Sequence, residues 1–338
     1  MPAANIPQGY FTHLNLAFLI IDPATFEVAG MDNYTQAQYG DLATLKKKQP
    51  GLQTWISVGG YSFNDPGPTN TTFSSLVAST ANQTVFFKSL ISFMDQYGID
   101  GVDIDWEYPG SAEREGKPED VKNYVTFLQN LRSALDAAGN ITRLGLTITT
   151  PASYYYLKTF DLVNIAPVID WFNVMTYDYH GVWDASKTVA AHTNLSEISE
   201  TMDLFWRNSI DPEKVTLGLG FYGRSFTLAP NATTCSGGIC PPGTSFVSGG
   251  DPGKCTNISG ILSATEIKDM LTTKNASAAL DTDAAVMIAQ WDKDQWISYD
   301  DTNSFELKLK YANSRCLGGM MIWSIDFDAD AAMQEALA

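Results

Sequence analysis

The feature that most constrains this chain is the run at residues 100–107, which reads Asp-Gly-Val-Asp-Ile-Asp-Trp-Glu. If the run is a β-strand, Asp103, Asp105 and Glu107 point to one face, because side chains alternate along a strand. The intervening side chains are apolar and predict packing on the opposite face: Val102, Ile104 and Trp106. Acids buried without a partner are costly. The run therefore favours a row of catalytic carboxylates over a solvated acidic edge.

Three motifs follow one another along the chain. The run at 100–107 matches the pattern DxxDxDxE, SVGG at 57–60 matches SxGG, and MTYD at 175–178 matches MxYD. With these motifs the chain resembles glycoside hydrolase family 18, the family of chitinases and chitinase-like proteins. Further similarity at 222–226 and 318–323 extends the resemblance through nearly the whole chain, which looks most similar to the secreted fungal chitinases.

Composition narrows the range of partners. The 338 residues, 44% of them hydrophobic, suit one large domain or a domain with an insert. The net charge of -17 argues against nucleic acid and anionic membranes as partners, since like charges repel. A neutral or cationic polymer is compatible, and we expect a monomer. The chain has no apolar run of 18 residues, so no membrane-spanning helix is predicted.

Sequons and cysteines indicate an extracellular, glycosylated protein. Eight Asn-x-Ser/Thr sequons occur, at Asn33, Asn70, Asn82, Asn140, Asn194, Asn231, Asn257 and Asn275. This density favours a secreted eukaryotic protein, although residues 1–5 lack the features of a signal peptide. Cys235, Cys240 and Cys255 cluster in a segment rich in Gly and Pro, as in a disulfide-stapled loop, with Cys316 far away. The spacing leaves the pairing open.

A zinc site is the weaker interpretation of the cysteines. The sequence has no CxxC pair, and its histidines lie away from the cysteines, at His13, His180 and His192. We expect neither a metal nor another cofactor.

Apolar runs alternate with segments of helical period, as in βα units that close around a parallel barrel. The predicted strands are 11–21, 52–58, 99–105, 144–150, 171–177, 215–221 and 319–325. Two predicted helices carry an apolar stripe and end at Gly98 and Gly139. The resemblance implies an α/β fold of the (β/α)8 TIM-barrel type. Because only seven strands are predicted, we expect this chain to be truncated at its N-terminus and to lack the first strand and a signal peptide.

The interval between the seventh barrel strand and its helix is too long for an ordinary βα loop. We expect a small α+β insertion domain at 226–291, with the catalytic barrel formed by 1–225 and 292–338. Ser263 and Glu266 form a predicted capping box, so the insert should contain a helix. By resemblance, this domain forms one wall of the substrate groove.

The resemblance also implies a mechanism. The substrate's own 2-acetamido carbonyl attacks the anomeric carbon and gives an oxazolinium ion, with Glu107 as general acid and then general base. Asp105 orients the acetamido group, Asp103 shares a proton with Asp105, and Tyr177 donates its hydroxyl to the acetamido oxygen. Expected substrate-binding residues are Trp323, Met175, Asp178, Tyr222, Arg224, Tyr61, Tyr108 and Trp183. Gly59 and Gly60 are interpreted as packing residues behind the acid row.

The sequence therefore predicts a secreted chitinase that cleaves β-1,4 bonds between N-acetylglucosamine units with retention of configuration. One alternative is a chitin-binding lectin on the same fold, which the presence of Glu107, Asp105 and Asp103 disfavours. Another is an endo-β-N-acetylglucosaminidase acting on N-glycans. The long insert and the Tyr222-Gly223-Arg224 segment argue for chitin.

Overall fold

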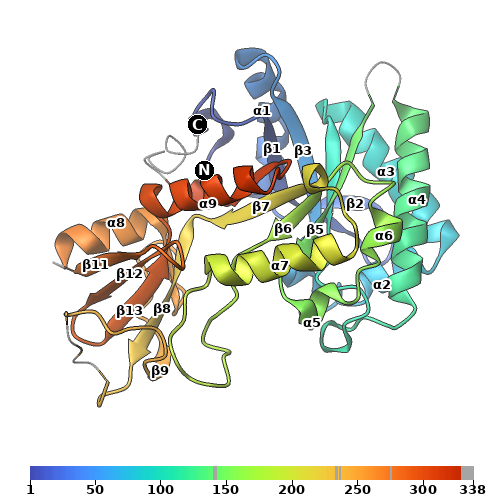
Figure 1. Cartoon of the computed structure of the whole chain (residues 1–338). Coiled ribbons are helices and arrows are strands. Elements are labelled where there is room, and N and C mark those ends of the chain that lie inside the picture. Colours follow the sequence, from blue (N-terminus) through green and yellow to red (C-terminus); the bar gives the residue numbers. More distant parts are fainter. Residues whose placement is uncertain (140–142, 233–234, 236, 275, 329–338) are drawn as a thin grey trace. The chain divides into compact units, whose positions relative to one another are not determined.

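The computed structural model describes residues 1–139, 143–232, 235, 237–274 and 276–328 (Figure 1). The chain divides into two compact units. The acid-row unit comprises Pro2–Val174 and Phe205–Thr216. The carboxyl-terminal unit comprises Met1, Met175–Leu204 and Leu217–Ala338.

The acid-row unit is built on strands that alternate with helices. Its strands are β1 (His13–Ile21), β2 (Val28–Gly30), β3 (Gln53–Gly59), β4 (Gly101–Asp105), β5 (Gly145–Pro151) and β6 (Phe172–Met175, whose last residue belongs to the other unit). The strand order is β6-β5-β4-β3-β1-β2. Strands β1, β3, β4 and β5 pair in parallel, whereas β2 returns antiparallel to β1. Parallel strands joined by helices place their carboxyl ends at one edge of the sheet.

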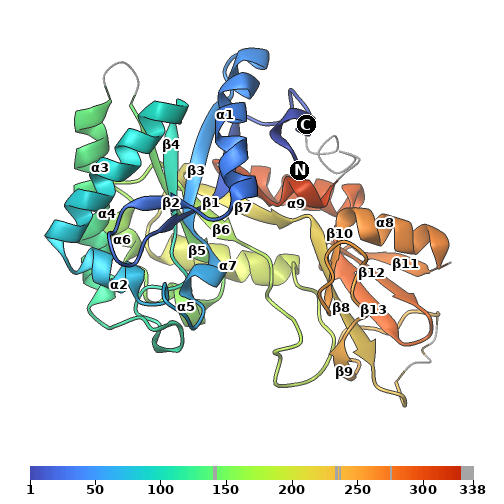
Figure 2. The ribbon, with the colours of Figure 1, turned by 180° about the vertical axis from the view of Figure 1, so that it is seen from behind.

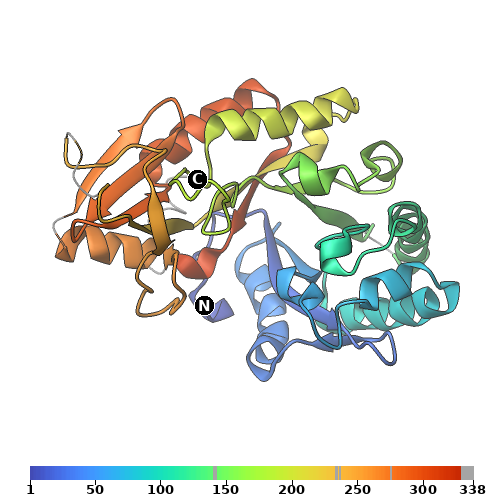
Figure 3. The ribbon, with the colours of Figure 1, turned by 90° about the horizontal axis from the view of Figure 1, so that it is seen from below.

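Helices cover the outer side of these strands (Figures 2 and 3). They are α1 (Asn33–Lys48), α2 (Thr72–Val77), α3 (Thr80–Tyr97), α4 (Asp120–Ala138), α5 (Tyr154–Leu157) and α6 (Leu162–Ile165), with short 3-10 turns η1 (Ala3–Asn5), η2 (Tyr61–Asn64), η3 (Ala112–Arg114) and η4 (Pro212–Lys214). The side chain of Ser79 caps α3, which ends at Gly98 with a φ of 65°. Glycine reaches this left-handed conformation without the clash that a Cβ would cause.

The core of this unit lies between the sheet and α3 and α4. Phe86, Leu90, Phe127 and Leu131 of these helices are fully buried. Behind the acids, Trp106 is 1% exposed and stacks on Phe73 with ring centroids 5.2 Å apart. Each such side chain contributes about 1.5–3 kcal/mol by burial. The apolar face of the 100–107 run is therefore tightly packed, as its alternation predicts.

The carboxyl-terminal unit contains β7 (Val215–Gly220, beginning in the acid-row unit) beside β14 (Gly319–Trp323), and a second sheet. The second sheet has the order β10-β8-β13-β12-β11, with β9 against β8, and these strands pair antiparallel. Its strands are β8 (Tyr222–Leu228), β9 (Phe246–Gly249), β10 (Ile261–Ser263), β11 (Ser277–Asp281), β12 (Val286–Trp291) and β13 (Gln295–Tyr299).

The other described helices are α7 (Leu195–Arg207), α8 (Ala264–Thr273) and α9 (Thr302–Ser314), and a 3-10 turn, η5, spans Ile325–Phe327. Helix α8 begins with the predicted capping box. The Ser263 hydroxyl accepts from the backbone N–H of Glu266, and the Glu266 carboxylate accepts from the backbone N–H of Ser263. Two otherwise unpaired N–H groups are satisfied in this way.

The seven predicted strands are all present, each within two residues of its predicted ends. The short β2 was not predicted. One disulfide joins Cys235 to Cys240, whereas Cys255 and Cys316 are free and exposed. Of the sequon residues, Asn140 and Asn275 lie outside the described part of the chain; Asn33, Asn231 and Asn257 are exposed.

The described residues contain neither a membrane-spanning helix nor a metal-binding cluster. None of their helices has the length and apolar character needed to cross a bilayer. Within the same residues, no group of three or more His, Cys, Asp or Glu side chains is arranged to hold a metal ion.

Candidate active site

The predicted acid row lies where β4 ends. Asp103 and Asp105 are on the strand, and Glu107 follows two residues after its last residue. Their exposed fractions are 2%, 6% and 6%. Strand β4 lies between β3 and β5, so the acids are flanked on both sides by paired backbone. This is the position at which catalytic groups gather in barrels of this kind.

Asp103 is surrounded by hydrogen-bond donors from three neighbouring strands. Its carboxylate accepts from Ser57 Oγ at 2.9 Å, Thr147 Oγ1 at 2.7 Å, Thr149 Oγ1 at 2.9 Å and Asn173 Nδ2 at 2.9 Å. Both carboxylate oxygens are used twice. Donors aimed at a carboxylate stabilise its ionised form, so this arrangement offsets the cost of burying the charge.

Asp105 has the opposite environment. Burial raises its pKa well above the ordinary value, and the neighbouring charges of Glu107 and Asp103 raise it further. Its Oδ1 atom is buried and has no hydrogen-bond partner in the described residues. The raised pKa favours a proton on Asp105.

The glycines of the SxGG motif pack against the acid row. A Cβ on Gly59 would lie 2.2 Å from the carbonyl oxygen of Asp105, and the φ of Gly59 is +113°. The N–H of Gly60 donates to that same carbonyl at 2.9 Å. The interpretation of these glycines as close-packing residues is confirmed by this geometry.

Two predicted binding residues of the acid-row unit differ in exposure. Tyr61 is 57% exposed, and the guanidinium of Arg114 lies 4.0 Å from its ring centroid. Tyr108 is buried, stacks on Tyr156 at 4.2 Å and hydrogen-bonds the Glu107 side chain. Burial, followed by the Glu107 charge, raises the pKa of Tyr108 far above its ordinary value, so its hydroxyl stays protonated. Tyr61 can meet a ligand, whereas Tyr108 contacts the acid itself.

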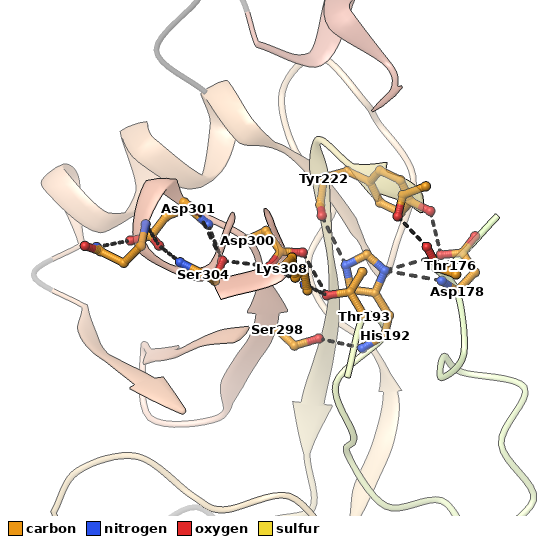
Figure 4. Close-up of polar contacts among 12 residues, drawn as sticks. Thr176, Asp178, His192, Thr193, Tyr222, Ser298, Asp300, Asp301, Ser304 and Lys308 are labelled. Atoms are coloured by element: carbon orange, nitrogen blue, oxygen red, sulfur yellow. Dashed lines mark hydrogen bonds and ion pairs between the residues drawn. The ribbon is translucent and has the colours of Figure 1, made fainter. Parts of the chain in front are cut away.

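A second group of predicted residues surrounds Asp178 in the carboxyl-terminal unit. Figure 4 shows Asp178 with Tyr222 and His192. The Asp178 carboxylate accepts from Arg224 Nε at 2.8 Å, Arg224 Nη2 at 2.6 Å and the Tyr222 hydroxyl at 2.7 Å. The guanidinium of Arg224 also lies 4.8 Å from the ring of Trp183, which is 53% exposed. The structure thus brings Asp178, Tyr222, Arg224 and Trp183 together.

The buried His192 completes this group. Its Nδ1 lies 3.5 Å from the Asp178 carboxylate and its Nε2 is 3.1 Å from the carbonyl oxygen of Tyr222. Burial would raise the pKa of Asp178, but hydrogen bonds from His192 and Arg224 and the Arg224 charge outweigh it, so that pKa lies well below its ordinary value. Asp178 is therefore a carboxylate that stays ionised. Its backbone has a φ of 61°, in the left-handed region that non-glycine residues rarely adopt.

A buried ion pair supports the segment that carries His192. Lys308 Nζ of α9 donates to Asp300 Oδ1 at 2.5 Å and to Thr193 Oγ1 at 2.9 Å, and Thr193 donates to Asp300 Oδ2 at 2.8 Å (Figure 4). Burial lowers the pKa of Lys308. Every partner in this network is paired, as buried charges require.

The remaining predicted residues lie at strand ends of the carboxyl-terminal unit. Met175 is the last residue of β6, and Trp323 is the last residue of β14 and 36% exposed. Tyr177 follows β6, and its ring centroid is 6.1 Å from that of Tyr222. The hydroxyl of Tyr177 lies 4.0 Å from the sulfur of Met321.

Several residues of the site were not predicted. Thr147 and Thr149 are two residues apart on β5, so their side chains point to the same face of the strand. This alternation could have identified them as a pair that faces the acids. Asn173 lies on β6 with the same alternation relative to Met175. Arg114 and His192 carry no comparable signal, because their partners lie far away in sequence.

Comparisons with known proteins agree with this arrangement. The model of the family "Glycosyl hydrolases family 18" matches residues 2–328. The secreted chitinase LysM12 of Penicillium expansum is 29% identical over 96% of this chain, which spans 22% of that protein's length.

Two solved structures are also similar. A mutant family 18 chitinase from Cycas revoluta, in complex with (GlcNAc)4, shares 27% identity over 100% of this chain and 94% of its own, with a TM-score of 0.85. Human YKL-39, a pseudo-chitinase with retained chitooligosaccharide binding, shares 26% identity over 100% of this chain and 93% of its own, with a TM-score of 0.88. The fold is accordingly of the α/β, TIM-barrel-like type, and the chain belongs to glycosyl hydrolases family 18.

Proposed function

We propose that this chain is a chitinase, which hydrolyses β-1,4 bonds between N-acetylglucosamine units with retention of configuration. The observation that carries the proposal is the unequal environment of the acid row. Asp103 accepts four hydrogen bonds, whereas Asp105 is buried with one unpaired oxygen. Such pairs of carboxyl groups, with environments that favour different protonation states, are typical of acid–base sites.

The proposed reaction uses the substrate as its nucleophile. Glu107 protonates the glycosidic oxygen while the acetamido carbonyl oxygen attacks the anomeric carbon, so that the glycosidic bond breaks and an oxazolinium ion forms. Glu107, now a carboxylate, takes a proton from water, which attacks the anomeric carbon and reopens the ring. Two inversions give net retention.

Asp105 has a supporting role in this scheme. Its unpaired Oδ1 is an acceptor for the acetamido N–H, and that contact orients the carbonyl for attack. The proton shared with Asp103 moves toward Asp103 as positive charge develops on the oxazolinium, which leaves a negative Asp105 beside it. Tyr108, whose hydroxyl bonds Glu107, holds the acid in place.

The group around Asp178 is proposed to bind the sugar. Tyr177 would donate its hydroxyl to the acetamido oxygen, while Met175 and Asp178 shape the same pocket. Trp323 would stack on the apolar face of the sugar. Tyr222 and Arg224 fix the Asp178 carboxylate, and the exposed Trp183 and Tyr61 are further stacking surfaces.

We further propose the domain organisation predicted from the sequence, with a catalytic barrel at 1–225 and 292–338 and an insertion domain at 226–291. The antiparallel strands and the helix α8 within 226–291 support it. We also propose that the protein is secreted, on the basis of its sequons and of the secreted relative. The expectation of a monomer is kept as a separate proposal.

A chitin-binding lectin is the second candidate, and the likeness to the pseudo-chitinase YKL-39 favours it. A lectin needs no general acid, yet Glu107 is present and contacts Tyr108. Incubation with N-acetylglucosamine oligomers distinguishes the two functions. A chitinase forms shorter products, whereas a lectin binds the oligomers without cleaving them.

The experiment compares chitohexaose with the fully deacetylated glucosamine hexamer. We expect cleavage of the first and none of the second, because the deacetylated sugar has no internal nucleophile. A thiazoline analogue of the oxazolinium should inhibit competitively. Equal cleavage of both oligomers would overturn substrate assistance and require a protein carboxylate as nucleophile.

A further inference from the structure

Arg114 contacts both the general acid and an exposed aromatic ring through one guanidinium. Its Nε donates to the main-chain carbonyl of Glu107 at 3.1 Å, and its Nη2 donates to the main-chain carbonyl of Tyr61 at 2.5 Å. Its Nη1 pairs with Asp65 at 2.8 Å. All three nitrogens are used, and the residue is only 8% exposed. A planar fork with several fixed donors holds its partners more tightly than an ammonium could.

The same guanidinium stacks on the ring of Tyr61, with Cζ 4.0 Å from the ring centroid. Tyr61 nevertheless remains 57% exposed. One face of the ring is therefore fixed against the protein, and the rest is open to a ligand. Cation–π stacking of this kind favours one orientation of the ring.

The loop that carries Arg114 is held by main-chain hydrogen bonds. The N–H groups of Arg114 and Gly116 both donate to the carbonyl of Ser111, at 2.9 Å and 2.8 Å. A Cβ on Gly116 would lie 2.5 Å from the backbone nitrogen of Ser111, so only glycine fits at this position of the turn. The turn directs the Arg114 side chain back toward the acid row rather than into solvent.

We propose that Arg114 is a positioning residue that fixes the Glu107 backbone and the Tyr61 sugar-stacking ring together, and thereby couples substrate binding to placement of the general acid. The proposal rests on the chitinase function proposed above. Tyr61 would stack on an N-acetylglucosamine unit next to the cleaved bond, because its backbone and that of Glu107 share one guanidinium. Arg114 touches no reacting atom and acts through these two partners.

The test compares Arg114→Lys with a matched control, Arg132→Lys. Arg132 is buried to the same degree, at 7% exposed, and forms ion pairs with Asp136 and Asp170 on another part of the acid-row unit. Both substitutions keep the positive charge and lose the planar guanidinium with its several fixed donors. Displacement of a catalytic group by about 1 Å can cost 10²-fold in rate. We expect Arg114→Lys to lower kcat on chitohexaose by about 10- to 100-fold and raise KM several-fold, while Arg132→Lys leaves both within twofold.

A second variant separates the two arms of the fork. In the Tyr61→Ala background, Arg114→Lys should no longer raise KM, because the ring that Arg114 orients is gone. It should still lower kcat, because the contact with the main-chain carbonyl of Glu107 is lost as before. Interaction between contacting residues appears as non-additivity of this kind. Full additivity in KM would overturn the coupling through Tyr61.

Amide hydrogen exchange gives a readout that does not depend on activity. Arg114→Lys should speed exchange at 61–65 and 107–111, and Arg132→Lys should not. If the wild-type chain does not cleave chitohexaose while these segments loosen, the chitinase function fails and the positioning contact stands. Unchanged exchange in both segments, or equal kinetic effects of the two lysine variants, would overturn the proposal.

Discussion

Thr147→Val tests whether the hydrogen bonds to the buried Asp103 stabilise the acid row. The hydroxyl of Thr147 donates to Asp103 Oδ1 at 2.7 Å, and the residue is 0% exposed. Valine has nearly the same shape and lacks the donor. A hydrogen bond to a charged group contributes about 1.5–3 kcal/mol, so the unfolding free energy at pH 7 should fall by that amount. The loss should stay below the upper value, since three donors remain.

Thr150→Val is the matched control on the same strand. Thr150 is also 0% exposed, but its hydroxyl has no hydrogen-bond partner in the described residues. Removing an unpaired buried hydroxyl leaves no group unsatisfied, so we expect a change of about zero or a small gain in stability. The difference between the two variants isolates the Asp103 contact from the generic effect of a Thr-to-Val change.

Urea unfolding followed by tryptophan fluorescence measures both variants, and chitohexaose hydrolysis measures their activity. Without the Thr147 donor, the Asp103 side chain is held less firmly beside Asp105. Proton sharing between the two acids should then be impaired, and kcat of Thr147→Val should fall roughly tenfold, which corresponds to about 1.4 kcal/mol. If Thr147→Val were no less stable and no less active than Thr150→Val, the reasoning on the acid row would be refuted.

Three more predictions concern charge. Burial raises the pKa of Asp105, so the folded chain keeps a proton that the unfolded chain releases above about pH 4, roughly the unfolded pKa. Asp105→Asn should therefore stabilise the protein by an amount that grows as pH rises above 4, measured by urea unfolding at pH 3–7. A stability difference that stays constant over this range would contradict the prediction. A hydrogen bond that the His180 ring donates to the Glu197 carboxylate raises the pKa of His180 to about 9. Wild-type stability should then decline as pH rises from about 6.5 to 9, and His180→Gln should remove that decline in the same assay. Arg224→Lys loses the two-point contact with Asp178 and should raise KM for chitohexaose about tenfold, with unchanged KM counting against a binding role.

Much of the acid-row unit could be predicted from the sequence because its signals are local. Alternation at 100–107 predicts the burial of Trp106, and helical periodicity with a terminal glycine predicts α3 up to Gly98. In the carboxyl-terminal unit, the capping box at Ser263 likewise marks the start of α8. Each of these rests on interactions within a few residues, which a single sequence displays directly.

The contacts that tune the site depend on distant segments. The four donors to Asp103 come from β3, β5 and β6, between 44 and 70 residues away. Arg114 meets Tyr61 across 53 residues, and His192 meets Tyr222 across 30. The pairing of Cys235 with Cys240, rather than Cys255, likewise depends on the fold of the loop. No local pattern specifies such partners.

The central claim is that Glu107 is the general acid of a chitinase, and Glu107→Gln tests it most directly. Glutamine keeps the shape of the side chain but carries no dissociable proton. Hydrolysis of chitohexaose by Glu107→Gln should fall by about 10²- to 10⁴-fold or more, while the affinity for chitohexaose, measured by calorimetry, should change little. Near-normal turnover in Glu107→Gln would contradict the account and place the acid elsewhere.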